Sequence, residues 1–219
     1  MDNREIHKYR MMRYFIEAAE KIIEEEGIEG VTIRKVAKLA GYNSATLYNY
    51  FQNQNHLIFF ASMRYLKDYA KDLYEYTKDC KNAMETYIKV WECFSYHSYK
   101  NPVFYNIIFF GDYSHSTVND AMKTYYSIFP EELSEKTQKF LPMLLEDNIY
   151  ERDYRVLQES VKEGFIKEED VHDINEMNVL IYQGMLLRMM NKNCPYTVEE
   201  AVEKTLKYVN QTLKSYRIK

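Results

Sequence analysis

The chain has 219 residues and a formal net charge of -4. Its hydrophobic share of 46% is ordinary for a soluble globular protein. A mean hydropathy of -0.55 and the lack of any apolar run near the length of a membrane-spanning helix, about 20 residues, exclude a membrane protein. No signal-peptide pattern opens the sequence, so we expect a cytoplasmic location without membrane contact. The chain has only six glycines and four prolines, which favours an all-α fold with long helices.

Apolar residues at helical spacing predict a first helix over residues 4–26, which Gly27 ends. Thr32 is well placed as the N-cap of a short second helix over residues 33–40. Gly41 follows that helix and marks a turn. A pair of short helices at the N-terminal end is therefore expected, with this turn between them.

A third short helix is expected to begin after a cap at Asn43 or Ser44 and to reach about residue 51. A long uninterrupted helix over residues 54–78 follows the polar segment 52–55. Further helices are expected over residues 82–99, 103–110, 117–128, 134–146, 150–163, 168–191 and 197–215, the last one opened by a capping box of Thr197 and Glu200.

The charges near the N-terminal end are distributed unevenly. Arg34, Lys35 and Lys38 are the only charged residues between Gly30 and His56. A second basic cluster lies at the start of the chain and consists of Arg4, Lys8, Arg10 and Arg13. The two basic clusters are separated by the acidic residues Glu17, Glu20, Glu24, Glu25, Glu26 and Glu29. Local excess of positive charge favours contact with nucleic acid more than the total charge does.

The segment from residue 32 to residue 51 has the pattern of a helix-turn-helix. Ala37 is the small residue that two short helices need where they cross, and Gly41 permits the turn. Val36, Ala40 and Leu47 supply the apolar contacts between the two helices. The other face of residues 44–50 then projects outward with short polar side chains, which fits the major groove of DNA.

The same segment resembles the DNA-binding domain of the TetR/AcrR family of transcriptional regulators. The resemblance covers about residues 5–60 and rests on Thr32-Ile33-Arg34-Lys35-Val36-Ala37, Ala40-Gly41, Thr46-Leu47-Tyr48 and Tyr50-Phe51, with Phe15, Ala18-Ala19 and residues 27–30 before them. It implies a three-helix DNA-binding domain over residues 1–52. It also implies a helical domain for effector binding and dimerisation over residues 53–219, which matches the family only in helical layout.

The resemblance implies a set of DNA-binding residues, namely Thr32, Arg34, Lys35, Asn43, Ser44, Ala45, Thr46, Tyr48, Asn49 and Tyr50. Thr32 and Tyr48 would contact phosphates, and Lys35 would lie near the DNA backbone. Residues 44–46 with Asn49 and Tyr50 would face bases or the groove wall, although Tyr50 fits the protein core equally well. Where the family has a lysine anchor this chain has Gln54, so we expect a shallow salt dependence of DNA binding.

Aromatic residues are dense after residue 87, and they allow two readings. Most of them must form packed core. A regulator also needs a cavity between helices, and a candidate lining is Trp91, Phe94, His97, Tyr105, Phe109, Tyr126 and Met143. The expected effector is small and largely apolar or aromatic. His97 is either a polar anchor for it or a partly exposed surface histidine.

The last two long helices carry apolar stripes that two helices cannot bury alone. One stripe is Ile174, Met177, Leu180, Ile181, Gly184, Met185, Leu187 and Arg188, and the other is Val198, Ala201, Val202, Thr205, Leu206, Tyr208, Val209 and Leu213. Pairing with a second copy into a four-helix bundle would cover them and make a homodimer. Burial against their own domain is the alternative.

Enzyme function is not indicated. The five histidines are scattered, no metal-binding or phosphate-binding motif is present, and Cys80, Cys93 and Cys194 have no redox spacing, so we expect no catalytic residues, no cofactor and no metal. The expected function is that of a ligand-responsive repressor that binds a palindromic operator as a homodimer, and an activator fits the same residues. A helical protein–protein adaptor is the alternative, and it predicts no binding to DNA.

Overall fold

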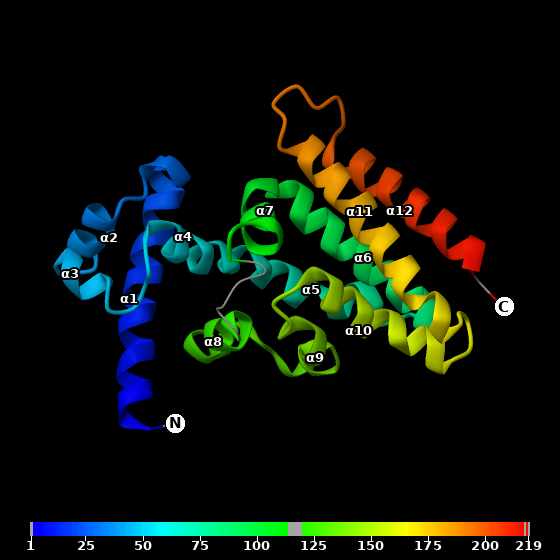
Figure 1. The fold of residues 1–219 in the computed structure, drawn as a ribbon, viewed down its shortest axis with the longest axis horizontal. Helices are drawn as coiled ribbons and strands as arrows, with labels where there is room; N and C mark the ends of the chain where they lie inside the picture. The colour runs from blue at the N-terminus through cyan, green and yellow to red at the C-terminus, as the bar shows by residue number, and fades with distance from the viewer. Residues whose placement is uncertain (1, 114–119, 217, 219) are drawn as a thin grey trace.

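The structure is a computed structural model that describes residues 2–113, 120–216 and 218. Every regular element in those residues is a helix, which confirms the all-α prediction. The molecule is elongated, with the N-terminal helices at one end and the last two helices at the other (Figure 1). None of the described helices is long and apolar enough to cross a membrane.

Three helices make up the N-terminal end: α1 Asn3–Glu26, α2 Ile33–Leu39 and α3 Ser44–Leu47. Asp2 and Glu5 form a capping box at the start of α1, and Gly27 ends that helix with a φ of +79°. A turn of 3-10 helix, Ile28–Gly30, then leads to α2. The first two helices therefore lie where the sequence predicts them.

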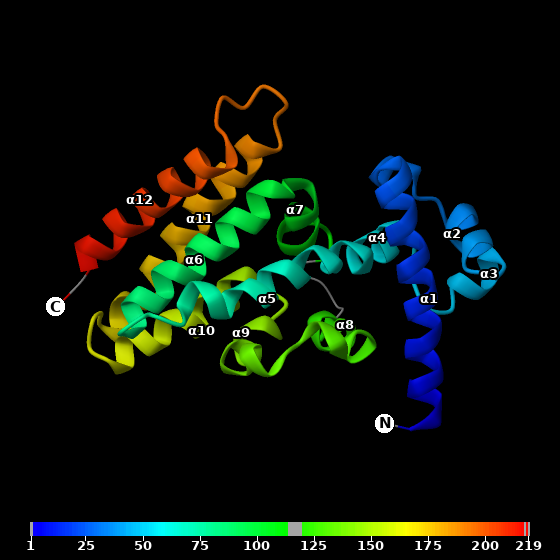
Figure 2. The same ribbon diagram turned by 180° about the vertical axis from the view of Figure 1, so that it is seen from behind.

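A long helical rod joins the two ends of the molecule (Figure 2). The sequence predicts one helix over residues 54–78, but the rod consists of α4 Gln54–Ser62, a 3-10 turn at Met63–Tyr65, and α5 Leu66–Thr77. The hydroxyl of buried Ser62 donates to the Ile58 carbonyl at 2.7 Å, a back-bond that bends helices. The interruption therefore follows from local hydrogen bonding that apolar periodicity does not report.

The remaining helices form a bundle around the second half of this rod. They are α6 Ala83–Lys100, α7 Pro102–Phe110, α8 Ala121–Ile128, α9 Leu141–Leu144, α10 Ile149–Lys162, α11 Val171–Met189 and α12 Val198–Tyr216. Helix α8 lies beside α1, and α11 and α12 run side by side (Figures 1 and 2). The capping box predicted for the last helix is confirmed, since Thr197 Oγ1 accepts from Glu200 N at 3.2 Å and Glu200 Oε2 from Thr197 N at 2.8 Å.

The prediction of one α-helix over residues 134–146 is wrong, because the first part of this segment is 3-10 helix. The structure has a 3-10 helix at Glu135–Phe140 followed by the single turn of α9. Pro142 has no N–H to donate to the carbonyl of Gln138, so an α-helix cannot run through it without losing a hydrogen bond. Pro142 instead occupies the first turn of α9, where a missing N–H costs nothing. Residues 117–119, the predicted start of the helix before it, lie outside the described residues.

A single hydrophobic core runs from the N-terminal helices into the bundle. Its largest fully buried side chains are aromatic, among them Phe15, Phe51, Phe60, Tyr69, Tyr105 and Phe109. Rings of this size bury much apolar area each, so they dominate the stability of both ends. The core reading of the aromatic density is confirmed for most of these residues.

Candidate DNA-binding surface and ligand cavity

The helix-turn-helix is held together by an aromatic cluster centred on α1. Phe15 is fully buried and its ring centroid lies 5.5 Å from Tyr42, 6.0 Å from Tyr50 and 6.3 Å from Phe51. Tyr42 lies in the turn between α2 and α3, and the other two rings follow α3. One residue of α1 therefore positions both the turn and the chain after the third helix.

The turn itself needs a glycine. Gly41 has a φ of +81°, a conformation that an L side chain adopts only with strain. The Tyr42 N–H donates to the Ala37 carbonyl at 2.8 Å, and this bond ends α2. Ala37 and Leu47 are buried between the two helices, as their spacing predicts.

The third helix is shorter than expected. Asn43 caps it, since its Oδ1 accepts from the Thr46 N–H at 2.9 Å and from the Thr46 hydroxyl at 3.1 Å. Helix α3 then ends at Leu47, and the N–H groups of Asn49 and Tyr50 bond three residues back instead of four. The chain up to Phe51 is therefore a tight helical turn and not a further stretch of α-helix.

All ten predicted DNA-binding residues lie on α2, on α3 or directly beside them, and these two helices lie at the outer end of the molecule (Figure 1). Seven are exposed: Thr32, Arg34, Lys35, Asn43, Ala45, Tyr48 and Asn49. Ser44, Thr46 and Tyr50 are half-buried, and Tyr50 leans on Phe15. Tyr50 thus packs partly on the core while still presenting an edge at the surface.

The positive charge of this surface is smaller than a residue count indicates. Lys35 forms an ion pair with Glu26 at the end of α1. Within the described ranges, Arg34 and Lys38 form no ion pair, and both are exposed. Arg13 of the other basic cluster is not a free cation either, because it pairs with Glu131 at 2.6 Å. Two free cations therefore remain on the helix-turn-helix.

The bundle contains a small cavity, of about 30 Å³, between α5, α6, α9 and α10. Three of the seven predicted lining residues border it, namely Trp91, Phe94 and Met143. The other residues around it are Tyr69, Val90, Ile149, Arg152, Asp153 and Val156, which the sequence pattern did not single out. A space of this size holds a water molecule but no drug-sized ligand.

The four remaining candidates for the lining lie elsewhere. Tyr105, Phe109 and Tyr126 are buried in the core but do not border this cavity. His97 is also buried, at 7% exposure, so the expectation of a partly exposed histidine is wrong. Its Nε2 lies 3.0 Å from Asp72 Oδ2, and burial lowers its pKa in spite of that carboxylate.

Asp153 is the ionisable group that sequence reasoning missed. Its Oδ1 accepts from Trp91 Nε1 at 2.9 Å and its Oδ2 accepts from the Tyr87 hydroxyl at 3.1 Å. The Tyr87 oxygen in turn accepts from Asn178 Nδ2 at 2.8 Å. Burial raises the pKa of Asp153 to about 7, and these two hydrogen bonds only partly offset that rise.

A signal for Asp153 and its neighbour Arg152 was present in the sequence. Ile149, Arg152, Asp153, Leu157 and Ser160 share helical spacing, so they lie on one face of α10, and all five are buried. Charged residues on an otherwise inward face are exceptional and indicate either paired charges or a binding site. Among the described residues, no cluster of His, Cys, Asp or Glu is suited to hold a metal.

Comparison with known proteins assigns the N-terminal region to a family model. Residues 15–59 match the model described as bacterial regulatory proteins, tetR family. This range holds Phe15, the whole helix-turn-helix and the first part of α4. No curated protein matches the chain in sequence.

Solved structures share the fold over nearly the whole chain. FadR of Thermus thermophilus, a TetR-family repressor in complex with lauroyl-CoA, has a TM-score of 0.61 at 11% identity and covers 92% of this chain and 94% of its own. RolR in complex with resorcinol has a TM-score of 0.59 at 13% identity, with 97% and 90% covered. A TetR-family regulator from Mesorhizobium loti has a TM-score of 0.55 at 13% identity, with 99% and 100% covered. At these identities the likeness concerns the fold.

Proposed function

We propose that this chain is a ligand-responsive repressor that binds a palindromic operator as a homodimer. The proposal is supported by the match of residues 15–59 to the tetR family model and by the fold that the chain shares with TetR-family structures. The proposal divides the chain into a DNA-binding domain over residues 1–52 and an effector-binding and dimerisation domain over residues 53–219. A cytoplasmic location is part of the same proposal, because the operator lies there. The observation that carries it is the exposed polar face of α2 and α3.

In the proposed complex, α3 lies in the major groove and its polar side chains read bases. Ala45 and Asn49 are exposed there, and Tyr48 is 56% exposed, so its hydroxyl can reach a phosphate without any rearrangement. Thr32 caps α2 with its Oγ1 at 3.3 Å from the Lys35 N–H. Its exposed hydroxyl can donate to a phosphate while it accepts that bond.

Dimerisation is supported by an apolar stripe that this chain alone leaves uncovered. Met177, Leu180 and Leu187 on α11 are between 44% and 54% exposed, and Tyr208 on α12 is 41% exposed. Gly184 lies in the same stripe, and a Cβ added there meets nothing within 4 Å. The other part of the two predicted stripes, including Ile174, Ala201, Val209 and Leu213, is buried in the chain's own core. The proposed interface is therefore narrower than the sequence indicated.

Response to a ligand is supported by the proteins of the same fold, and the cavity would have to expand to admit more than a water molecule. Two proteins of the same fold are described in complex with resorcinol and with lauroyl-CoA. We place the effector of this chain in the cavity beside Trp91, and expect a small, largely apolar or aromatic molecule. Binding would enlarge the cavity and shift α4, so that the two recognition helices no longer span the 34–36 Å or so between successive major-groove sites.

The test is a mobility shift and a footprint on the DNA directly upstream of the protein's own gene. A two-fold symmetric footprint is expected, and a footprint without that symmetry contradicts the dimeric mode. No shift on any promoter-sized fragment favours a protein–protein adaptor. The oligomeric state of the same protein can be measured by analytical ultracentrifugation, and a dimer is expected.

Charge variants make the DNA test specific. Replacing Arg34 and Lys38 with Ala is expected to weaken binding and to reduce the slope of log K against log salt by about 0.9 for each phosphate that the protein no longer neutralises. Lys71→Ala is the matched control, because Lys71 is an exposed cation on α5, far from α2 and α3. Equal reductions of affinity in the control and in the double variant would contradict the proposed surface.

A further inference from the structure

Arg152 is a buried cation on the cavity wall, with an exposure of 4%. Its Nε donates to the Glu146 carbonyl and its Nη2 to the Leu144 carbonyl, both at 2.7 Å. Its Nη1 is buried and has no hydrogen-bond partner in the part of the chain that the structure describes. The ring of Phe109 lies 5.0 Å from the guanidinium carbon and is a weak substitute. A charged donor left unpaired in a core is costly, so such groups are usually paired.

The neighbouring carboxyl does not supply the missing partner. Asp153 follows Arg152 in the chain, but its two oxygens accept from Trp91 and Tyr87 on α6. No ion pair of Arg152 occurs among the described residues. Since burial raises the pKa of Asp153 to about 7, much of this carboxyl is neutral near pH 7. One end of a buried guanidinium therefore lacks a counter-ion, next to an apolar space.

From this arrangement we propose that the effector is a small organic acid whose carboxylate binds Nη1 of Arg152. Its apolar or aromatic body packs among Tyr69, Trp91 and Phe94. The inference rests on the ligand response proposed above and specifies its chemistry. A guanidinium donates through two edges. Nε and Nη2 already use one edge on the carbonyls of Glu146 and Leu144, and the end formed by Nη1 and the second N–H of Nη2 matches a carboxylate.

A surface groove adjoins the cavity. A groove of about 810 Å³ lies between α9, α10 and the start of α6, and Met143 and Val156 border both the groove and the cavity. Methionine is flexible, so a change of its side-chain rotamer can open a passage. Cations exceed acids along this groove, which favours the approach of an anion. They are Lys81, Lys139, Arg155 and Lys162, against Glu159 and Glu163.

The experiment uses matched pairs in which a carboxylate is replaced by an uncharged amide of the same shape. The probes are phenylacetate with phenylacetamide, and octanoate with octanamide. Trp91 is the only tryptophan of the chain and lies on the cavity wall, so its fluorescence reports binding directly. In the wild-type protein we expect the acid of a pair to bind about tenfold to hundredfold more tightly than its amide, the range of a hydrogen bond to a charged group.

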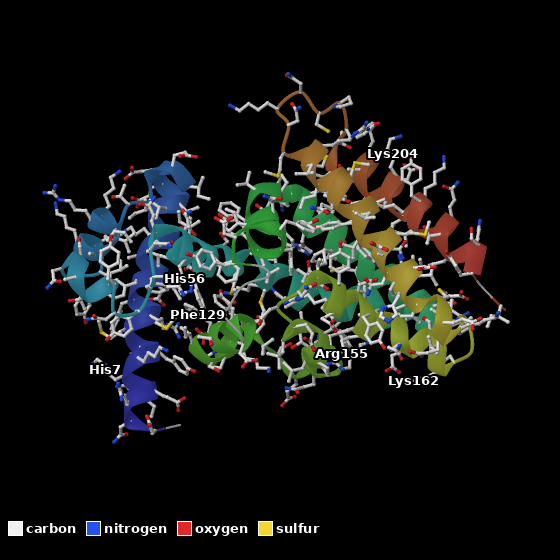
Figure 3. All side chains as sticks on the ribbon, viewed as in Figure 1. His7, His56, Phe129, Arg155, Lys162 and Lys204 are labelled. Carbon is white, nitrogen blue, oxygen red and sulfur yellow. The ribbon has the colours of Figure 1, made fainter. Side chains whose placement is uncertain are left out.

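Two variants separate Arg152 from the general charge of the groove. In Arg152→Gln the acid and its amide are expected to bind alike, while an amide side chain can still donate to an α9 carbonyl. Arg155→Gln is the control, because Arg155 lies three residues on along the same helix but is exposed and pairs with Glu146 at 2.9 Å (Figure 3). It is expected to keep the preference for the acid. Circular dichroism and thermal melting of each variant report its fold.

Three results would overturn the inference. The first is an amide that binds the wild-type protein as tightly as its acid, which needs no variant. The second is a preference for the acid that survives in folded Arg152→Gln. The third is a neutral compound that changes Trp91 fluorescence and releases DNA when no acid does so. That result would overturn the acidic effector but not the proposed function as a ligand-responsive repressor. Absence of DNA binding by the unliganded protein would contradict the proposed function instead.

Discussion

Arg152 and Asp153 are adjacent in the chain and both are buried, yet their charges are stabilised in different ways. Arg152 donates to two backbone carbonyls at the end of α9, which carry partial negative charge. Asp153 accepts two hydrogen bonds but has no cation beside it, so desolvation dominates and its pKa rises. These two neighbouring residues are therefore held by different partners, the guanidinium by backbone carbonyls and the carboxyl by the side chains of Trp91 and Tyr87.

The raised pKa of Asp153 predicts a stability that falls as pH rises. The folded state holds this proton up to about pH 7, whereas the unfolded chain loses it near the ordinary value of 3.8. Between these two values the folded state binds more protons, so the free energy of unfolding decreases with pH, by at most about 1.4 kcal/mol per unit for one group.

Asp153→Asn removes that titration and keeps a carbonyl oxygen for Trp91. The difference in unfolding free energy between the variant and the wild type is expected to grow in favour of the variant from about pH 4 to pH 7, and then to level off. Urea denaturation at several pH values measures it. A difference that does not depend on pH would show that Asp153 has an ordinary pKa. Glu20, whose pKa burial also raises to about 7, is unchanged in both proteins and cancels.

At the scale of elements, the interruptions are more informative than the helices. Helices α4 and α5 are joined by a 3-10 turn at Met63–Tyr65, and a 3-10 helix at Glu135–Phe140 precedes α9. Short 3-10 segments inside helical runs often mark hinges. The first lies between the helix-turn-helix and the cavity, and the second lies beside the cavity. Both lie where the proposed ligand response would require the backbone to adjust.

The exposed stripe on α11 leads to a prediction about assembly. Leu180 is 54% exposed, so Leu180→Asp should leave the fold of one chain intact. In a dimer the same change would bury an unpaired carboxylate, which is strongly unfavourable. We expect the variant to sediment as a monomer and to lose most of its operator affinity.

Val103→Asp is the matched control for that prediction. Val103 is an aliphatic residue on α7 with an exposure of 39%, and it lies outside the stripe. The control is expected to remain a dimer. If Leu180→Asp also remains a dimer at micromolar concentration, the interface lies on another surface of the molecule.

At the scale of the whole molecule, side chains of α1 and α4 contact the bundle on two sides. The Tyr113 hydroxyl, after α7, donates to Asn53 Oδ1 at 2.9 Å, and Asn53 also caps α4. The Tyr113 ring stacks on His56 with centroids 4.9 Å apart. On the other side, Arg13 of α1 pairs with Glu131 and lies over the ring of Phe129, which follows α8 and is labelled in Figure 3. The bundle therefore contacts both α1 and α4.

Tyr113→Phe tests whether this link carries the ligand response. The change removes the bond to Asn53 but keeps the stack on His56, so the fold should persist. The coupling between effector and DNA, measured as the ratio of DNA affinities without and with effector, is expected to fall by up to about fivefold to tenfold, the worth of one hydrogen bond. Fluorescence anisotropy with labelled operator measures both affinities.

The control for that variant is Tyr74→Phe on α5. Its ring contacts Lys136, and its hydroxyl has no hydrogen bond among the described residues. It is expected to leave the ratio unchanged. A ratio that Tyr113→Phe also leaves unchanged would mean that the Tyr113–Asn53 bond does not carry the coupling.

The all-α fold and the helix-turn-helix could be predicted from the sequence. Helical periodicity, the caps at Thr32 and Thr197 and the glycines at 27 and 41 predicted the all-α fold and the helix-turn-helix, because such signals act within a few residues. The outward polar face of residues 44–50 followed from the same local rules, whereas the individual DNA-binding residues were implied by the family resemblance. The family resemblance rested on this region, which is also where the family model matches.

The cavity was decided only by tertiary structure. Tyr69, Trp91, Met143 and Arg152 come from four helices, and no local pattern says which buried aromatics will border a gap and which will pack tightly, as Tyr105 does. The same holds for charge, since Arg13 and Lys35 counted as free cations until their partners were known. Local sequence determines which helices form and which face each buries. Which faces meet depends on contacts between distant residues, and those contacts decide where a ligand can bind.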